Sequence, residues 1–250
     1  MSTPRVFSES ELAVGKAVKL SAEDSHHLST VLRLGIGDEF RLIERKSGRE
    51  FSARIDSETP PLKATITAEH ANATTTSRVK TLCLALLKGE RGDLVIEKAC
   101  ELGVHKIIVY SAERSIVQLG DGQAQANKLA RWNKIALAAA KQCKRTSIPE
   151  ILYEPNLTSL FKQLSETKAS EDRLLCCSLS AGALELRKLR PATGYVHLLV
   201  GPEGDLTPTE EEALVKFGFE LVNLGPNTLR AETAAIAAVA MAQGVWGSIS

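Results

Sequence analysis

The sequence contains no apolar run of the length that a membrane-spanning helix requires. Such a helix needs about 18 consecutive apolar residues, and no stretch of the 250 residues reaches that length. The first ten residues also lack the apolar region of a signal peptide. We therefore expect a cytoplasmic protein with no membrane partner. Because 44% of the residues are hydrophobic, the chain can form one large or two modest cores.

Motifs for metals, disulfides and common nucleotides are missing as well. The five cysteines are odd in number and include no Cys-x-x-Cys pair, which argues against a zinc ribbon or a disulfide framework and indicates buried, reduced thiols. No cluster of His, Asp and Glu suggests a metal site. The chain has neither Gly-x-x-x-x-Gly-Lys-Ser/Thr nor Gly-x-Gly-x-x-Gly after a strand, so nucleoside triphosphates and dinucleotides are disfavoured as ligands.

Two segments rich in glycine and proline stand out instead: residues 198–210, LLVGPEGDLTPTE, and residues 224–233, LGPNTLRAET. Each has the pattern of a strand end, a loop and a helix start. In the first, Gly201 and Gly204 allow a sharp turn and a close approach of the backbone to a bound group, while Pro202 stiffens the turn. Ordinary tight connections explain either loop alone. Together, the loops indicate a ligand site lined by backbone groups.

A helix is predicted to follow each loop. Thr207 fits an N-cap, with Pro208 at the first helical position and Glu210 completing a capping box. The loop at Gly225 leads into an alanine-rich helix from about Ala231.

Two patterns of secondary structure follow one another along the chain. Short strand-like runs at 39–43, 51–55 and 63–67 alternate with turns, which predicts a small β-barrel. The small, polar stretch 71–77 has no periodicity and is typical of a linker. We therefore expect one domain over residues 1–72 and a second over 78–250.

From residue 78 onward, strand patterns alternate with helical patterns, which indicates a parallel sheet covered by helices. Such sheets bind ligands beyond the carboxyl ends of their strands, where both loops fall. The predicted strands are 79–87, 106–110, 151–153, 174–178, 196–200 and 221–224, and the predicted helices are 93–102, 123–144, 156–166, 181–188, 207–217 and 231–245.

Positive charge is concentrated in the middle of the chain. Residues 78–145 carry 13 Lys and Arg against 6 Asp and Glu, although the whole chain has a net charge of only +1. Such a segment can contact RNA phosphates, or it can be a solvated helix face. The cations that one long helix would present are Lys128, Arg131, Lys134, Lys141, Lys144 and Arg145.

A series of short motifs runs through nearly the whole chain. They are His26-His27-x-x-x-Val31-Leu32-Arg33-Leu34, Gly37-Asp38, Lys88-Gly89-Glu90-Arg91, Glu97-Lys98-Ala99-Cys100-Glu101-Leu102-Gly103-Val104, Ser111-Ala112-Glu113-Arg114-Ser115, Arg131-Trp132-x-Lys134-Ile135-Ala136, Gln142-Cys143-x-Arg145, Pro149 and the two loops. In this order, they resemble the ribosomal RNA small subunit methyltransferase E family, which belongs to the knotted SPOUT class of RNA methyltransferases.

The resemblance implies a fold and an activity. It implies a PUA-like β-barrel that helps to hold RNA, followed by an α/β SPOUT domain with a C-terminal trefoil knot and a cofactor site at about 174–245. Strand order alone would favour an unknotted sheet, because threaded chains are rare. The implied reaction is the transfer of a methyl group from S-adenosylmethionine to N3 of a uridine in 16S ribosomal RNA. The implied partners are 16S RNA or the small ribosomal subunit.

The resemblance also assigns residues to the reaction. No metal is needed, since the sulfonium already activates the methyl group and positioning carries much of the catalysis. Arg230 would stabilise the uridine anion, and Glu232 is the candidate base. An acid in the first turn of a helix also complements the helix dipole, so Glu232 has a structural alternative. The matching cofactor positions are Leu199, Gly201, Gly204, Leu224, Gly225, Leu229 and Ala231.

The family positions that would face RNA lie in both domains. His26 and His27 have packing or capping as an equal alternative, whereas Arg33 has no evident structural purpose in its apolar run. The full set is Arg5, His26, His27 and Arg33 in the barrel, and Lys88, Arg91, Arg114, Lys144 and Arg145 in the second domain.

The chain departs from the family pattern at four positions. Asp205 replaces a usual glycine, Asn227 a usual arginine, Ala231 a usual threonine and Lys141 a usual glutamate. The departures at Asn227 and Ala231 support one alternative, a non-catalytic RNA-binding or ribosome-assembly factor. Two others are a SPOUT methyltransferase acting on another RNA site and a small-molecule α/β enzyme, which the N-terminal barrel and the basic middle segment disfavour.

The alanines of the last predicted helix bear on the oligomeric state. They would permit another helix to pack closely against this one, or they serve helix stability alone. The resemblance implies a homodimer in which the two knots pack together.

Overall fold

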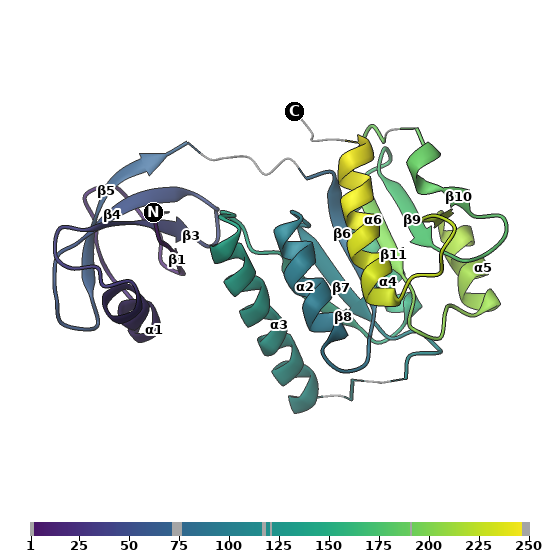
Figure 1. Cartoon of the computed structure of the whole chain (residues 1–250), viewed down its shortest axis with the longest axis horizontal. Helices are drawn as coiled ribbons and strands as arrows, with labels where there is room; N and C mark the ends of the chain where they lie inside the picture. Colours follow the sequence, from purple (N-terminus) through teal and green to yellow (C-terminus); the bar gives the residue numbers. More distant parts are fainter. Residues whose placement is uncertain (1–2, 72–76, 117–118, 121, 191, 247–250) are drawn as a thin grey trace. The chain divides into compact units, whose positions relative to one another are not determined.

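The computed structural model describes residues 3–71, 77–116, 119–120, 122–190 and 192–246 (Figure 1). Clustering of contacts divides the chain into two compact units. The first comprises Met1–Thr74 together with Ala140–Ile148, and the second comprises Thr75–Ala139 together with Pro149–Ser250. Within the described residues, no helix is both long and apolar enough to cross a membrane.

The first unit is a five-stranded sheet with one short helix, α1 (Ala22–His26), followed by a π-helical turn, η1 (His27–Val31). Among the described residues of this unit, one strand pair is parallel, that of β1 with β3, and the others are antiparallel. The three strands predicted in this region are confirmed, but two strands of four and three residues were too short to give a sequence pattern. In sheet order, the strands are β1 (Arg5–Ser8), β3 (Glu39–Glu44), β4 (Glu50–Ile55), β5 (Lys63–His70) and β2 (Ala17–Lys19).

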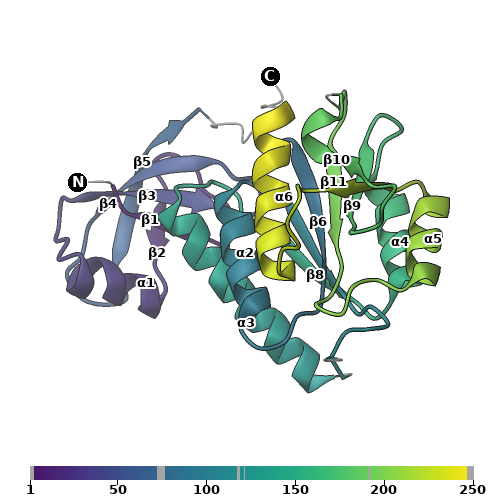
Figure 2. The same cartoon turned by 45° about the vertical axis from the view of Figure 1, so that its right-hand side comes forward.

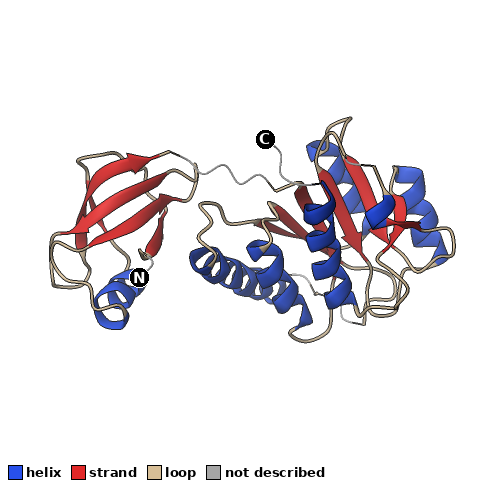
Figure 3. Cartoon of the chain, turned by 45° about the horizontal axis from the view of Figure 1, so that its top comes forward, coloured by secondary structure: helices blue, strands red, loops and turns tan. Residues whose placement is uncertain are grey.

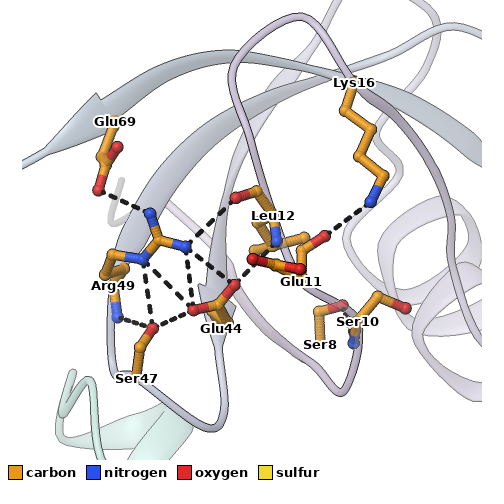
Figure 4. A network of polar contacts seen from close by, with 9 residues as sticks. All are labelled: Ser8, Ser10, Glu11, Leu12, Lys16, Glu44, Ser47, Arg49 and Glu69. Atoms are coloured by element: carbon orange, nitrogen blue, oxygen red, sulfur yellow. Dashed lines mark hydrogen bonds and ion pairs between the residues drawn. The ribbon is translucent and has the colours of Figure 1, made fainter.

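A buried carboxylate fixes the chain segment between β1 and β2 (Figure 4). Glu44 accepts the backbone N–H of Leu12 at 2.8 Å and the guanidinium of Arg49 at 3.2 Å. The hydroxyl of Ser47 also donates to this carboxylate. The hydrogen bond from Ser47, and then that from Leu12, lower the pKa of Glu44 despite its burial. The pair with Arg49 therefore stays ionised inside the unit.

The second unit is built on a sheet of seven parallel strands (Figure 3). Every described strand pair in it is parallel, so the carboxyl ends of all strands lie at one edge. In sheet order, the strands are β10 (Leu184–Glu185), β12 (Glu220–Asn223), β9 (Arg173–Cys177), β11 (Val196–Val200), β6 (Val79–Ala85), β7 (Lys106–Tyr110) and β8 (Glu150–Glu154).

Helices cover both faces of this sheet. Alternate strand residues such as Cys83, Tyr110 and Leu199 form one apolar core with Leu160 and Leu214, which belong to α4 (Leu157–Thr167) and α5 (Pro208–Phe217). On the other face, α6 (Ala231–Trp246) packs on β11 and β6 and beside α2 (Arg91–Glu101). Figure 2 shows α2 and α6 side by side in front of the sheet. The predicted helix-covered parallel sheet is confirmed.

One predicted helix is wrong. Residues 181–188 form the short strand β10 and a 3₁₀ turn, η2 (Leu186–Lys188), and not an α-helix. β10 pairs with β12 at the sheet edge, and the side-chain amide of Asn223 donates to the carbonyl of Ala183 at 2.8 Å. These tertiary hydrogen bonds override the local helix preference.

The long helix α3 (Gln123–Gln142) ends before the last two cations of the predicted basic face. Lys144 adopts a left-handed backbone with φ of 63°, which a helix cannot continue, and Arg145 is buried. The expectation that one helix presents all six cations is therefore wrong.

A carboxylate on α2 holds the middle of α3. Asp93 accepts a hydrogen bond from the indole N–H of Trp132 at 3.0 Å, from Arg131 Nε at 2.8 Å and from Lys128 Nζ at 3.3 Å. Trp132 is 1% exposed and Asp93 is 7% exposed. Two of the predicted RNA-facing cations thus serve to neutralise a buried acid.

We expect Asp93→Ala to destabilise the second unit by about 1–3 kcal/mol, because it leaves a buried indole N–H without an acceptor. Both tryptophans of the chain, Trp132 and Trp246, lie in this unit, so urea unfolding followed by tryptophan fluorescence measures the change. Asp93→Asn keeps an acceptor and is the control. Equal stability of the alanine variant and the wild type would contradict this role.

Candidate functional site

A cavity of about 420 Å³ lies at the carboxyl ends of β9, β11 and β12. Its walls come from residues 177–179, 200–203, 205, 222–225 and 227–231, with Arg91 and Ala234 completing them. The two glycine-proline loops, which are about twenty residues apart in sequence, thus form one pocket.

The first loop turns tightly because of two residues. A Cβ on Gly201 would lie 3.0 Å from Cγ of the buried Leu206, so any larger residue would push on the core. Asp205 has φ of 61°, in the left-handed region that favours glycine. Its carboxylate accepts the backbone N–H of Leu206 at 3.0 Å. Aspartate tolerates this backbone by such local bonding, which gives a physical account of its presence where the family has glycine.

The predicted capping box after this loop is confirmed. The hydroxyl of Thr207 accepts the backbone N–H of Glu210 at 3.2 Å, and the Glu210 carboxylate accepts that of Thr207 at 2.9 Å. Pro208 occupies the first helical position. The Thr207 hydroxyl also donates to Glu113, which follows β7, at 3.2 Å. The cap therefore ties the loop to the neighbouring strand end.

The second loop turns at a glycine whose backbone conformation other residues rarely adopt. Gly225 has φ of 135°, which a side chain would disfavour although the space beside it is open. The chain then passes Asn227 and Thr228 along the cavity and enters α6 at Ala231.

Arg91, which lines the cavity, lies between two acids: Glu203, which also lines it, and Glu232 at the start of α6. The guanidinium of Arg91 lies 3.2 Å from Glu203 Oε1 and 3.9 Å from Glu232 Oε1. Glu203 also accepts the backbone N–H of Lys88 at 3.1 Å. The second oxygens of Glu203 and Glu232 are buried and have no hydrogen-bond partner among the described residues. One carboxylate oxygen of each acid therefore remains as an acceptor.

Arg230 occupies a different environment on the same cavity. Its side chain is exposed and lines the cavity. No acid among the described residues forms an ion pair with it, so its guanidinium remains available to a ligand.

Most of the predicted cofactor positions meet in the cavity. Gly201, Leu224, Gly225, Leu229 and Ala231 all line it. Two others lie outside its lining: Leu199 is fully buried in the sheet core, and Gly204 is exposed and lies against Arg114.

Sequence reasoning missed the wall formed by Cys177, Ser178 and Leu179. This segment has no glycine-proline signal. The available indications were its place at the end of the predicted strand 174–178 and the implied cofactor region at about 174–245, which contains it.

The predicted RNA-facing residues of the first unit differ in their exposure and in their bonding partners. His26, His27 and Arg33 are exposed, and Arg33 adopts φ of 57°. Arg5 pairs with Glu50 at 3.2 Å and also donates to the carbonyl of Lys144, whose own side chain is exposed. Arg145 is buried and donates to Ser147 at 3.2 Å, and Lys141 pairs with Asp24 at 3.0 Å.

The predicted RNA-facing residues of the second unit lie around the cavity. Lys88, Arg91 and Arg114 are exposed, and Arg91 forms ion pairs with two acids. Arg114 donates to the carbonyl of Gly204 at 3.4 Å, so it lies directly on the first loop.

We expect Thr207→Ala to destabilise the second unit by about 1 kcal/mol or somewhat more, because the helix loses its cap and Glu113 loses a donor. Thr209→Ala, an exposed threonine of the same helical turn, is the matched control and should change stability by less than about 0.5 kcal/mol. Urea unfolding followed by tryptophan fluorescence compares the two. Similar losses in both variants would show that the capping box does not hold the loop.

Family models match both units of the chain. The RNA methyltransferase domain family matches residues 75–243, and the RNA methyltransferase PUA domain family matches residues 20–67.

Individual relatives match over almost the whole chain. A ribosomal RNA small subunit methyltransferase E from Neisseria gonorrhoeae, solved with S-adenosylmethionine, is 32% identical, with 98% of both chains covered and a TM-score of 0.86. A methyltransferase from Legionella pneumophila, solved with the same cofactor, is 30% identical over the whole of both chains, with a TM-score of 0.88. The Bacillus subtilis ribosomal RNA small subunit methyltransferase E is 28% identical, with 93% of this chain and 92% of the relative covered. Fold, site and sequence agree, and the chain belongs to the ribosomal RNA small subunit methyltransferase E family.

Proposed function

We propose that this protein transfers a methyl group from S-adenosylmethionine to N3 of one uridine in 16S ribosomal RNA. The observation that carries the proposal is the cavity at the sheet edge, where the loops at 200–205 and 222–231 meet. These segments coincide with the part of the chain matched by the methyltransferase family.

The residues of the cavity fit this cofactor. Its volume of about 420 Å³ lies within the range of about 300–1,000 Å³ typical of small-molecule sites. Val200, Val222, Leu224 and Leu229 give it apolar walls, and the close approach at Gly201 would leave backbone groups free to bind adenine and methionine polar atoms. When bound, the cofactor supplies a methyl group that its sulfonium has already activated.

Side chains near the cavity would accept the proton of uridine N3 and stabilise the negative charge that develops on the base. Uridine N3 must lose a proton as the methyl group arrives, and the buried free oxygen of Glu232 can accept it. Arg91 Nε lies 3.9 Å from the other oxygen of Glu232, so its positive charge favours the ionised carboxylate that a base requires. Arg230, whose guanidinium is free, would hold a uridine carbonyl oxygen and stabilise the developing negative charge.

The trefoil knot and the homodimer are part of the same proposal. Half of the alanine face of α6 is used within the chain, since Ala235, Ala238 and Ala242 are fully buried, whereas Ala240 is exposed. A dimer contact would therefore use the exposed side of α6. Sedimentation velocity of the full chain measures its oligomeric state.

A non-catalytic RNA-binding factor is the second candidate. Ala231 lines the cavity where relatives have a threonine hydroxyl, and Asn227 lines it where they have an arginine. Loss of both groups favours a chain that keeps the site but has lost the reaction.

Mapping of methylated uridines separates these functions. Deletion of the gene should remove one N3-methyluridine from 16S RNA, as detected by mass spectrometry of RNA fragments, and the purified chain should restore it on small subunits from the deletion strain. Persistence of every N3-methyluridine in the deletion strain would overturn the assignment.

We expect Arg230→Ala to lower the methylation rate about 100-fold or more, because one transition-state donor is lost. Cofactor affinity, measured by calorimetry, should change little. Arg190→Ala removes another exposed arginine of this unit and serves as the control. An unchanged rate in the Arg230 variant would exclude Arg230 from the reaction.

We expect Glu232→Gln to lower kcat by about 100-fold or more if the carboxylate accepts the proton. If Glu232 only complements the helix dipole, the variant should instead lose about 0.3–1 kcal/mol of stability and keep its kcat. Glu203→Gln is the matched control, since Glu203 also binds Arg91 but is not assigned to the proton transfer. Rates and urea unfolding of the two variants decide between these roles.

A further inference from the structure

A second cavity, of about 440 Å³, lies at the carboxyl ends of β7 and β8. Its walls are residues 111–113 and Leu119 after β7, Tyr153 of β8, residues 155–158 beyond β8, and Glu210 of α5. The motif at 111–115 therefore forms part of a cavity, and methyl transfer alone gives this cavity no role.

The two cavities open at the same edge of the sheet. β11, which ends at the first cavity, is separated from β7 only by β6. With strands about 4.8 Å apart, the ends of β11 and β7 are roughly 10 Å apart. The loop at 201–207 joins the two sites, because Gly204 lies against Arg114 and Thr207 donates to Glu113.

One carboxylate in the second cavity has an open acceptor. Glu113 accepts the Thr207 hydroxyl on Oε2 at 3.2 Å, and its Oε1 has no donor among the described residues. Both oxygens of Glu210 are already used, by the backbone N–H groups of Glu113 and Thr207. The hydroxyls of Ser111 and Tyr153 lie 2.8 Å apart, and the Tyr153 hydroxyl also donates to the carbonyl of Leu119 at 3.4 Å, so both hydroxyls already have partners. A ligand would therefore donate a hydrogen bond to Glu113 and stack on the half-buried ring of Tyr153.

This chemistry selects a class of ligand. Two carboxylates disfavour a phosphate and favour N–H donors, and unpaired RNA bases are bound by stacking on aromatic rings and by hydrogen bonds to their edges. Guanine presents two adjacent N–H groups to a carboxylate, and cytosine and adenine present an amino group. Uracil presents one N–H between two carbonyl oxygens that Glu113 would repel.

We propose that the second cavity binds an unpaired, amino-bearing base of the RNA, preferentially guanine, near the uridine that enters the first cavity. This inference rests on the proposed RNA substrate. The exposed Lys88 and Arg114 follow β6 and β7, so they lie where the RNA backbone would pass between the two bases. They would bind its phosphates.

Saturation-transfer NMR on the full chain tests the proposal with guanosine, adenosine, cytidine and uridine at millimolar concentration. Saturating S-adenosylmethionine fills the cofactor position of the first cavity, so that nucleosides do not bind in its place. Guanosine should give the strongest signals and uridine the weakest. Tyr153→Leu should reduce the guanosine signal about tenfold through loss of stacking, and Glu113→Gln should remove the preference over uridine. Tyr195→Leu, which changes a tyrosine next to the amino end of β11, is the control and should keep both the guanosine signal and the preference over uridine.

Three results would overturn the proposal: no signal from any nucleoside, equal signals from uridine and guanosine, or a Tyr153→Leu variant that behaves as the wild type. Binding of spermidine in place of nucleosides would also overturn it, since the cavity would then be a cation site. If S-adenosylmethionine does not bind, the proposed function fails separately. The comparison of wild type with Tyr153→Leu without cofactor then still decides whether this cavity binds a base.

Discussion

The parallel pairing of β11 with β9 and β6 is the constraint on which the site depends. Val200, the last residue of β11, is paired with Cys177 at the end of β9 and with Leu84 near the end of β6. Because these strands end together, the chain segments that follow them must share one edge of the sheet. β12 pairs on the outer side of β9 and brings the second glycine-proline loop to the same edge. A register shift in any of these pairs would separate the cavity walls.

Several cations of residues 78–145 are paired with neighbouring acids, so they do not form one large basic surface. The excess of cations in residues 78–145 suggests an RNA-binding helix, yet Lys128 and Arg131 are bound to Asp93. Arg91 is likewise held between Glu203 and Glu232. The cations left for RNA are the exposed ones around the sheet edge, including Lys88, Arg114 and Arg230. This distribution favours recognition close to the reacting base.

Sequence patterns predicted the strands and loops of the second unit well, because each buried parallel strand is a short apolar run bounded by turn residues. The capping box at Thr207 was predictable for the same reason, since it depends only on residues three apart. The failures depend on contacts between distant segments. Residues 181–188 have helical character but pair with β12, and the wall at 177–179 is recognisable only after β9 and β11 are placed side by side. Asp205, which replaces the usual glycine, has a left-handed backbone that glycine or aspartate can adopt, and the sequence alone does not indicate that conformation.

We infer that the two loops form the S-adenosylmethionine site, and isothermal titration of the full chain with this cofactor tests whether they do. We predict saturable binding at one site per chain, and we expect Gly201→Val to abolish it, because a Cβ at this position would already lie 3.0 Å from Leu206. Tryptophan fluorescence should confirm that the variant is folded. No detectable heat of binding at millimolar cofactor, or unchanged affinity in a folded Gly201→Val variant, would contradict the account.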